Sequence, residues 1–152
     1  MSPVAGLAGS RRRRALRACC SAVAAAAFVL AISGCGAPGP RKADAVLAAR
    51  NFQTALNGGS FGRACALLAP ETRQEVAAAD ADGCVQALPQ EHLPVASGAV
   101  ADAVAEVYGR QAMVRLSGDT LFLSQFGKGW KVVAAGCTPR PDLPFDCQVK
   151  GG

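Results

Sequence analysis

The sequence predicts an α+β fold in which N-terminal helices pack on a curved, four-stranded antiparallel sheet. Residues 44–88 carry apolar side chains at helical spacing, whereas residues 100–134 alternate between two kinds of side chain as strands do. Glycine-containing turns separate the alternating segments, which is typical of hairpins between consecutive strands. Because a sheet with one apolar face has to be covered, the preceding helices are the expected cover.

The first predicted helix covers residues 44–57 and ends at Gly58 and Gly59, which suit a helix C-terminus. We expect Asp44 in its first turn, where the helix dipole favours a carboxylate. The apolar residues of this helix recur at intervals that place them on one face: Ala45, Ala49, Phe52 and Leu56.

Shorter helical segments follow the glycine pair. Ser60 is the expected N-cap of a helix over residues 61–68, because its hydroxyl can accept a hydrogen bond from a free N–H group. Pro70 is expected to open a helix over residues 70–79, since proline is favoured in a first turn. A turn and a last helical turn are expected over residues 80–83 and 84–88.

Four strands in an antiparallel meander are predicted after Pro94. They cover residues 100–108, 112–116, 120–126 and 130–134. Four aromatic residues lie in these strands: Tyr108, Phe122, Phe126 and Trp130. We expect them to pack in the core rather than to form a ligand cage, because a covered sheet needs such side chains.

Residues 1–34 have the layout of a bacterial secretion signal. A basic segment, residues 1–17, precedes an apolar segment, residues 18–33, that is shorter than the roughly 20 residues of a membrane-spanning helix. The small residues Ser33 and Gly34 favour cleavage over the alternative, an uncleaved membrane anchor. The arginine-rich start also loosely resembles a twin-arginine signal, so the export route stays open.

The sequence Ile32-Ser33-Gly34-Cys35 resembles the lipobox of bacterial lipoproteins. The resemblance implies that the sulfur of Cys35 receives a diacylglyceryl group, with fatty acids such as palmitate, and that the chain is cut directly before it. Residues 35–42 then comprise the lipidated cysteine and a short tether, and residues 43–152 form a single α+β domain. The anchor implies a position on the extracytoplasmic face of the cell membrane.

The charge of the chain argues against a nucleic-acid partner. The formal net charge is +5, from 16 Lys and Arg against 11 Asp and Glu. Five of those 16 residues are arginines of the signal segment, so the remaining chain has 11 residues of each sign. A nucleic-acid-binding domain is expected to keep a basic excess on its folded part. The expected partners are therefore the membrane, through the lipid anchor, and an unidentified small ligand or envelope protein.

Three of the seven cysteines belong to the signal segment and the lipid site, and four remain in the domain: Cys65, Cys84, Cys137 and Cys147. An even number in an exported domain indicates two disulfides, for which three pairings are possible. The local pairing, Cys65 with Cys84 and Cys137 with Cys147, fits the predicted elements best. The first bridge joins two helical segments, and the second closes residues 138–146, which contain three prolines and are interpreted as a loop. A zinc site is the rival interpretation, but no Cys-x-x-Cys pair occurs and the only histidine is His92.

No catalytic residue, metal ligand or cofactor is predicted. His92 lies in a linker before a proline, where a lone histidine is more often plain surface than a catalytic base. Ser117-Gly118-Asp119 is interpreted as a turn. Asp102 and Glu106 can share one strand face as a carboxylate pair, but solvated charges are the simpler interpretation.

The helices, the meander and the strand at residues 129–133 together resemble the NTF2-like (SnoaL-like) fold, in which helices pack over a cone-shaped sheet. Residues 52–60, Phe-Gln-Thr-Ala-Leu-Asn-Gly-Gly-Ser, look like the Phe-x-x-Ala-Leu-x-x-Gly-Asp opening of that superfamily, with Ser60 in the acidic position. The chain is also similar to actinobacterial lipoproteins that end in three short motifs, found here at residues 130–132, 136–139 and 146–147.

The sequence leaves two hypotheses about function. The first is a non-enzymatic, membrane-anchored lipoprotein that binds a small ligand or a protein partner at the cell envelope. The second is an NTF2-like enzyme that uses polar groups inside the cone, with Asp102 or Tyr108 among them. Buried, converging ionisable groups in a pocket favour the enzyme, whereas a cone filled by Leu, Val and Phe favours the binding protein.

Overall fold

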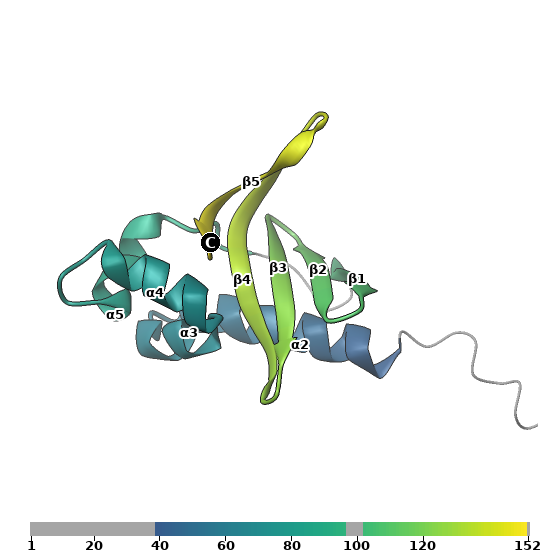
Figure 1. The fold of residues 1–152 in the computed structure, drawn as a ribbon, viewed down its shortest axis with the longest axis horizontal. Helices are drawn as coiled ribbons and strands as arrows, with labels where there is room; N and C mark the ends of the chain where they lie inside the picture. Colours follow the sequence, from purple (N-terminus) through teal and green to yellow (C-terminus); the bar gives the residue numbers. More distant parts are fainter. Residues whose placement is uncertain (1–38, 97–101, 152) are drawn as a thin grey trace, which may run out of the picture. The chain divides into compact units, whose positions relative to one another are not determined.

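The computed structural model describes residues 39–96 and 102–151 of the chain (Figure 1). The chain divides into two compact units, Met1–Ala37 and Pro38–Gly152, and the fold described below is that of the second. The predicted signal segment and Cys35 lie outside the described residues, as does the start of the first predicted strand.

The helical half comes first along the second unit. Its elements are α2 (Pro40–Asn57), α3 (Phe61–Leu67), α4 (Pro70–Ala78), α5 (Cys84–Ala87) and the 3₁₀ helix η2 (Leu88–Glu91). Within the described residues, no helix combines the length and the apolar character that crossing a bilayer requires.

One prediction about helix ends is wrong and a second is confirmed only in its position. The helix α2 begins at Pro40, so Asp44 lies beyond its first turn, where no acidic residue is found. Proline favours this earlier start, because its missing N–H group is one that a first turn leaves unbonded anyway. Ser60 is the N-cap residue of α3 as predicted, but its side chain makes no capping hydrogen bond. Its backbone carbonyl accepts from the N–H groups of Arg63 and Ala64.

The strands form one antiparallel meander in the order β1-β2-β3-β4-β5 (Figure 1). They are β1 (Val104–Tyr108), β2 (Gln111–Leu116), β3 (Asp119–Phe126), β4 (Gly129–Arg140) and β5 (Leu143–Lys150). The α+β prediction is confirmed, but the prediction of four strands is wrong, because residues 138–146 are not a loop. They complete β4 and begin β5, joined by a tight turn at Pro141 and Asp142, where Asp142 has a φ of 56°.

The helices cover one face of the sheet and form the core with it. The helix α2 packs against β1 to β4, and α4 packs against β4 and β5. Alternate strand residues point toward the helices, so in β3 Leu121 and Leu123 are fully buried. Across the ladder they pair with Val114 and Ala112 of β2, which are buried too. Core side chains from both layers fill the space between helices and sheet: Phe52, Leu88, Val114, Leu121, Leu123, Val132 and Val149.

The helical layer is hydrogen-bonded to the sheet at a β-bulge in β4. Leu123 pairs with Val132, whereas Phe122 pairs with Ala134, so Val133 is the extra residue. The carbonyl of Val133 accepts hydrogen bonds from Thr72 Oγ1 and from the N–H of Gly151, both at 3.0 Å. The N–H of Ala69 donates to the Val132 carbonyl at 2.7 Å. The junction between α3 and α4 is thereby attached to β4.

The opposite face of the sheet is only partly covered. Trp130 is buried as expected, but Tyr108 is 70% exposed, so the prediction of a core role for Tyr108 is wrong. Its side chain belongs to the outward-facing set of β1, since the alternation places Ala105 and Val107 toward the helices. Phe122 also points outward, and its ring meets that of Phe145 edge-on at 5.2 Å between centroids. Phe122 and Phe126 are only half-buried and are not part of the core, so the core prediction is wrong for them too.

A hairpin arm extends from the sheet beyond the disulfide between Cys137 and Cys147. This arm consists of residues 138–146 and projects away from the helices (Figure 1). Cys137 and Cys147 are directly opposite each other in the register of β4 and β5. The other disulfide joins Cys65 in α3 to Cys84 in α5. The structure therefore has the local pairing of the four cysteines, one bridge in each layer.

Candidate functional site

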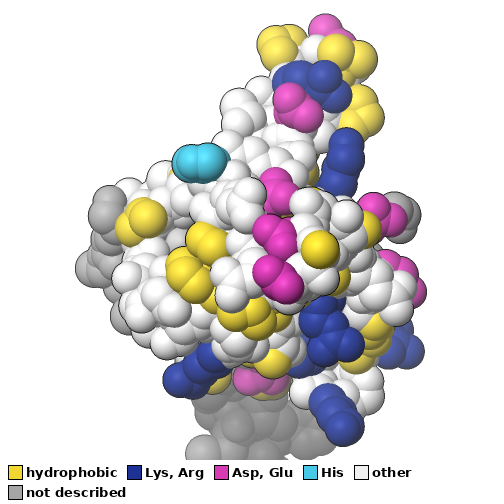
Figure 2. All heavy atoms as spheres, turned by 90° about the vertical axis from the view of Figure 1, so that its left-hand side faces the viewer, with side chains coloured by type: hydrophobic (Ala, Val, Ile, Leu, Met, Phe, Trp, Pro, Cys, Tyr) yellow, Lys and Arg dark blue, Asp and Glu magenta, His cyan; other side chains and the backbone are white. Residues whose placement is uncertain are grey.

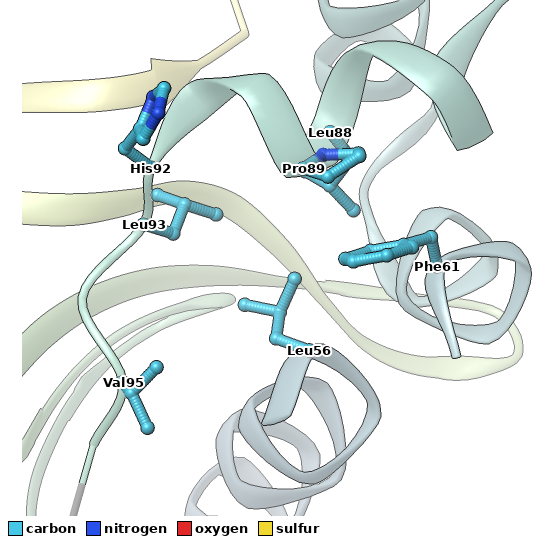
Figure 3. A pocket seen from close by; sticks show the side chains of 7 residues that line it. All are labelled: Leu56, Phe61, Leu88, Pro89, His92, Leu93 and Val95. Carbon is cyan, nitrogen blue, oxygen red and sulfur yellow. The ribbon is translucent and has the colours of Figure 1, made fainter. Parts of the chain in front are cut away.

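An apolar cavity of about 120 Å³ lies between the end of α2, α3, η2 and the segment that follows η2 (Figure 3). We call residues 92–96, which run along its side, the strap. Six of the seven lining side chains are hydrocarbon, and His92 is the exception. The lining residues are Leu56, Phe61, Leu88, Pro89, His92, Leu93 and Val95.

Local backbone chemistry explains how these residues come together. The helix α2 stops at Asn57, and Gly59, with a φ of 65°, turns the chain so that Phe61 opens α3 beside Leu56. After η2, His92 has a φ of 50°, and this left-handed residue ends η2 and turns the chain into the strap. Histidine is one of the residues that tolerate this left-handed conformation better than most.

The cavity suits an apolar group. In Figure 3 the side chains of Leu56, Phe61 and Leu93 point toward the space between the elements, whereas the His92 ring points away from it. The volume is close to that of an engineered hydrocarbon-lined cavity of ~150 Å³ that binds benzene. A single ring or a short branched alkyl group is therefore the size of ligand that fits.

A buried polar cluster, formed by Gln53 and Asp119, is hydrogen-bonded to the end of the strap. Gln53 of α2 donates from Nε2 to Asp119 Oδ2 at 2.6 Å, and its Oε1 accepts from the N–H of Ala96 at 3.2 Å. The second oxygen of Asp119, Oδ1, accepts from the N–H of Gly136 at 3.0 Å. Gln53 and Asp119 together thus link the helix, the strap and two strands, and both residues are buried.

Burial raises the pKa of Asp119 from 3.8 to about 6. Desolvation disfavours the charged carboxylate and is the largest cause of the shift. The hydrogen bonds from the backbone N–H groups of Gly136, Thr120 and Cys137, and from the Gln53 side chain, act in the opposite direction and lower it. The carboxylate therefore changes charge in mildly acidic solution.

A second recess, of about 220 Å³, lies at the base of the hairpin arm. It is lined mainly by polar groups from β4 and β5: Gly136, Thr138, Asp146, Cys147 and Gln148. Gly136 has a φ of 66°, and a Cβ atom there would lie 2.6 Å from Gln148 Oε1 and 2.9 Å from Leu93 Cδ2. Because Gly136 has no side chain, Gln148, Leu93 of the strap and Asp119 can all approach it closely.

The residues considered for chemistry in the sequence do not form a site. Asp102 is exposed. Glu106 makes an ion pair with Arg115 at 2.8 Å and accepts a hydrogen bond from the Tyr108 hydroxyl at 3.2 Å, so it is not half of a carboxylate pair. His92 is exposed at the cavity rim. No group of three or more His, Cys, Asp or Glu in the described part of the chain has the arrangement of a metal site.

The sequence reasoning missed the two central polar residues. Gln53 follows Ala49 at helical spacing and so belongs to the buried face of α2, which was a usable signal. Asp119 was interpreted as part of a turn, although it is the first residue of β3 and shares the parity of Leu121. Had Asp119 been assigned to the strand instead of to the turn, this parity would have indicated a buried carboxylate.

Comparison of the chain with protein-family models, with characterised proteins and with solved structures finds no match.

Proposed function

We propose that this chain is an exported lipoprotein, anchored through Cys35 to the extracytoplasmic face of the cell membrane, whose domain binds a small apolar ligand without catalysis. The apolar cavity beside the strap is the observation that carries the binding role. Its lining is almost wholly hydrocarbon, which is the character of most small-molecule sites. We further propose that the helices and the sheet form an NTF2-like arrangement. The packing of the helices on one face of an antiparallel meander supports this proposal.

Two features support export. The order of basic, apolar and small residues before Cys35 is that of a lipoprotein signal. The two disulfides of the domain support the same conclusion, because such bonds persist outside the cytosol and are rare within it.

The composition of the core supports a binding role over an enzymatic one. The space between helices and sheet is filled by side chains such as Phe52, Leu121 and Leu123. Asp119 is the buried ionisable residue of the described chain. Its Oδ2 accepts a hydrogen bond from Gln53, and its Oδ1 accepts one from the N–H of Gly136. The carboxylate is not among the residues that line either cavity, so it is poorly placed to meet a substrate.

Ligand binding is tested by an NMR titration of the domain with benzene as the probe. We expect saturable shifts of the Leu56 and Leu93 methyl signals, because both residues line the cavity. Val95→Trp should weaken binding by about tenfold or more, equivalent to about 1.4 kcal/mol, by filling the cavity mouth. Val95 is 64% exposed, so the change should not disturb the fold.

Leu47→Trp is the matched control, since Leu47 is 58% exposed and lies outside the cavity. If the two tryptophan variants bind benzene equally well, the cavity is not the site.

The anchor is tested separately in the producing cells. Radiolabelled palmitate should be incorporated into the full chain, and Cys35→Ala should abolish the label and release the protein from the membrane. A Cys35→Ala variant that remains membrane-bound would contradict the anchor.

A further inference from the structure

One end of the sheet carries a cluster of exposed basic side chains. The cluster, called the basic end below, comes from the start of α2, the β1–β2 turn and the β3–β4 turn. Its basic members are Arg41, Lys42, Arg110 and Lys128, and it also includes Tyr108, the last residue of β1; all five are exposed.

The contacts of Gln125 bring these three segments together. The Arg41 guanidinium donates to Gln125 Oε1 at 3.0 Å and to the carbonyl of Gly109. Arg110 donates from Nε to the backbone carbonyl of Gln125 at 3.0 Å. Lys128 lies in the turn that directly follows β3, the strand to which Gln125 belongs. The Arg41 guanidinium also lies 5.9 Å from the centre of the Trp130 ring, which fixes it against the sheet.

The charges elsewhere in the domain have the opposite balance. Residues 71–91, from α4 to η2, contain five acidic residues and one basic residue, Arg73. The start of α2 and the elements α4 and α5 lie at opposite sides of the fold in Figure 1. On the face with α4 and α5, Figure 2 shows basic side chains gathered low on the domain and others on the arm, with a row of acidic side chains between them. A domain without net charge thus has a charge asymmetry.

We propose that the basic end is a docking surface for the anionic phospholipid headgroups of the membrane. This inference rests on the proposed lipid anchor, because Cys35 precedes Pro40, the first residue of α2, by only five positions. A short tether brings the basic end, rather than the acidic segment, to the bilayer. Lys and Arg near an anionic membrane are attracted to it, and an exposed tyrosine such as Tyr108 suits the headgroup region.

The test uses the unit Pro38–Gly152 without a lipid, which contains the described core and both disulfides. In sedimentation with vesicles, it should bind phosphatidylglycerol vesicles and not phosphatidylcholine vesicles, and added salt should weaken the binding. The double variant Arg110→Glu/Lys128→Glu should lower the partition constant by about tenfold or more.

The matched control is Arg73→Glu/Arg140→Glu, which changes the net charge by the same amount at sites outside the basic end. Its binding should fall by no more than about threefold, as expected of a weak effect of net charge alone. Equal losses in the two double variants, or no preference for phosphatidylglycerol, would overturn the proposal.

The vesicle-binding test and the palmitate-labelling test can fail independently, so the proposed docking surface and the proposed anchor are tested separately. Palmitate on Cys35 together with no binding of the lipid-free unit to phosphatidylglycerol would leave the anchor standing and overturn the basic end. Binding that depends on Arg110 and Lys128 without palmitate on Cys35 would support the surface and contradict the anchor.

Discussion

A single carboxylate ties together parts of this fold that are far apart in the sequence. Asp119 of β3 contacts Gln53 of α2 and Gly136 of β4, and Gln53 in turn holds Ala96 of the strap. Because these groups are buried, each hydrogen bond that is lost leaves a polar atom without water to replace it. The cluster therefore positions the strap, and with it one wall of the apolar cavity.

We expect Asp119→Asn to remove a pH dependence of stability. The pKa of this carboxyl is about 6 in the folded chain, against an ordinary value of 3.8, so the native state binds more protons between these two pH values. The contribution of Asp119 to stability is then fully present below pH 3.8 and is lost as the pH rises through 6. Urea denaturation across this range should show the free energy of unfolding falling by roughly 2 kcal/mol more in the wild type than in the variant.

Asp44→Asn, at an exposed position of α2, is the control for this series and should behave as the wild type does. Parallel pH profiles for the wild type and Asp119→Asn would show that Asp119 does not titrate as described.

Gly136, which donates to Asp119, is a position where an added side chain is poorly tolerated. We expect Gly136→Ala to lower the free energy of unfolding by roughly 3 kcal/mol, since the left-handed backbone and the contacts with Gln148 and Leu93 both oppose a Cβ atom. Gly127→Ala, where nothing lies within 4 Å of the added atom, should cost no more than about 0.5 kcal/mol. Chemical denaturation of the two variants measures the difference, and similar losses would contradict this account.

At the scale of elements, each layer of the fold has its own disulfide. Cys65–Cys84 joins α3 to α5, two short helices that pack mainly against other helices and have few direct contacts with the sheet. Cys137–Cys147 joins two strands that are already paired in the sheet, at the base of the arm. The first bridge therefore constrains elements that no strand ladder holds together, whereas the second reinforces an existing ladder.

Replacing a cysteine pair by alanine should consequently have unequal effects. We expect Cys65→Ala/Cys84→Ala to lower the free energy of unfolding by about 3 kcal/mol. Cys137→Ala/Cys147→Ala should cost less, because Pro139, Pro141 and Pro144 already restrict the unfolded chain between those cysteines. Denaturant titration of both double variants tests the order, and a greater loss in the second would reverse the argument.

The elements also show how far the sequence could be used. Helical spacing and strand alternation predicted the helical half and β2 to β4 in the right order, because burial of one face leaves a periodic pattern. The arm was missed because prolines at 139, 141 and 144 suggested a loop, whereas edge strands and turns accept proline. The apolar cavity depends on contacts between α2, η2 and the strap, which no local pattern records.

For the molecule as a whole, one core joins the helices to the sheet. The buried cluster includes Phe52 of α2, Leu88 of η2, Leu121 of β3 and Val149 of β5. Because no element has an apolar face that is satisfied without the others, the unit Pro38–Gly152 is expected to unfold as one cooperative system.

Trp130, the only tryptophan of the chain, provides a probe of this cooperativity. Its side chain is buried in β4, so its fluorescence reports the packing of the sheet against the helices. We expect its thermal transition to coincide with the loss of helix followed by far-ultraviolet circular dichroism. Two separate midpoints would show that the helical half and the sheet unfold independently.

The position of proline in the arm has a consequence for how copies of this protein meet one another. The strand β5 is the last of the described sheet, and such a border normally offers a row of free N–H and C=O groups to any passing chain. Pro144 has no N–H to offer, and the arm turns the first part of β5 away from the rest of the sheet. Edge-to-edge pairing of β5 with the sheet of a second copy, which would extend one sheet into the next, is thereby discouraged.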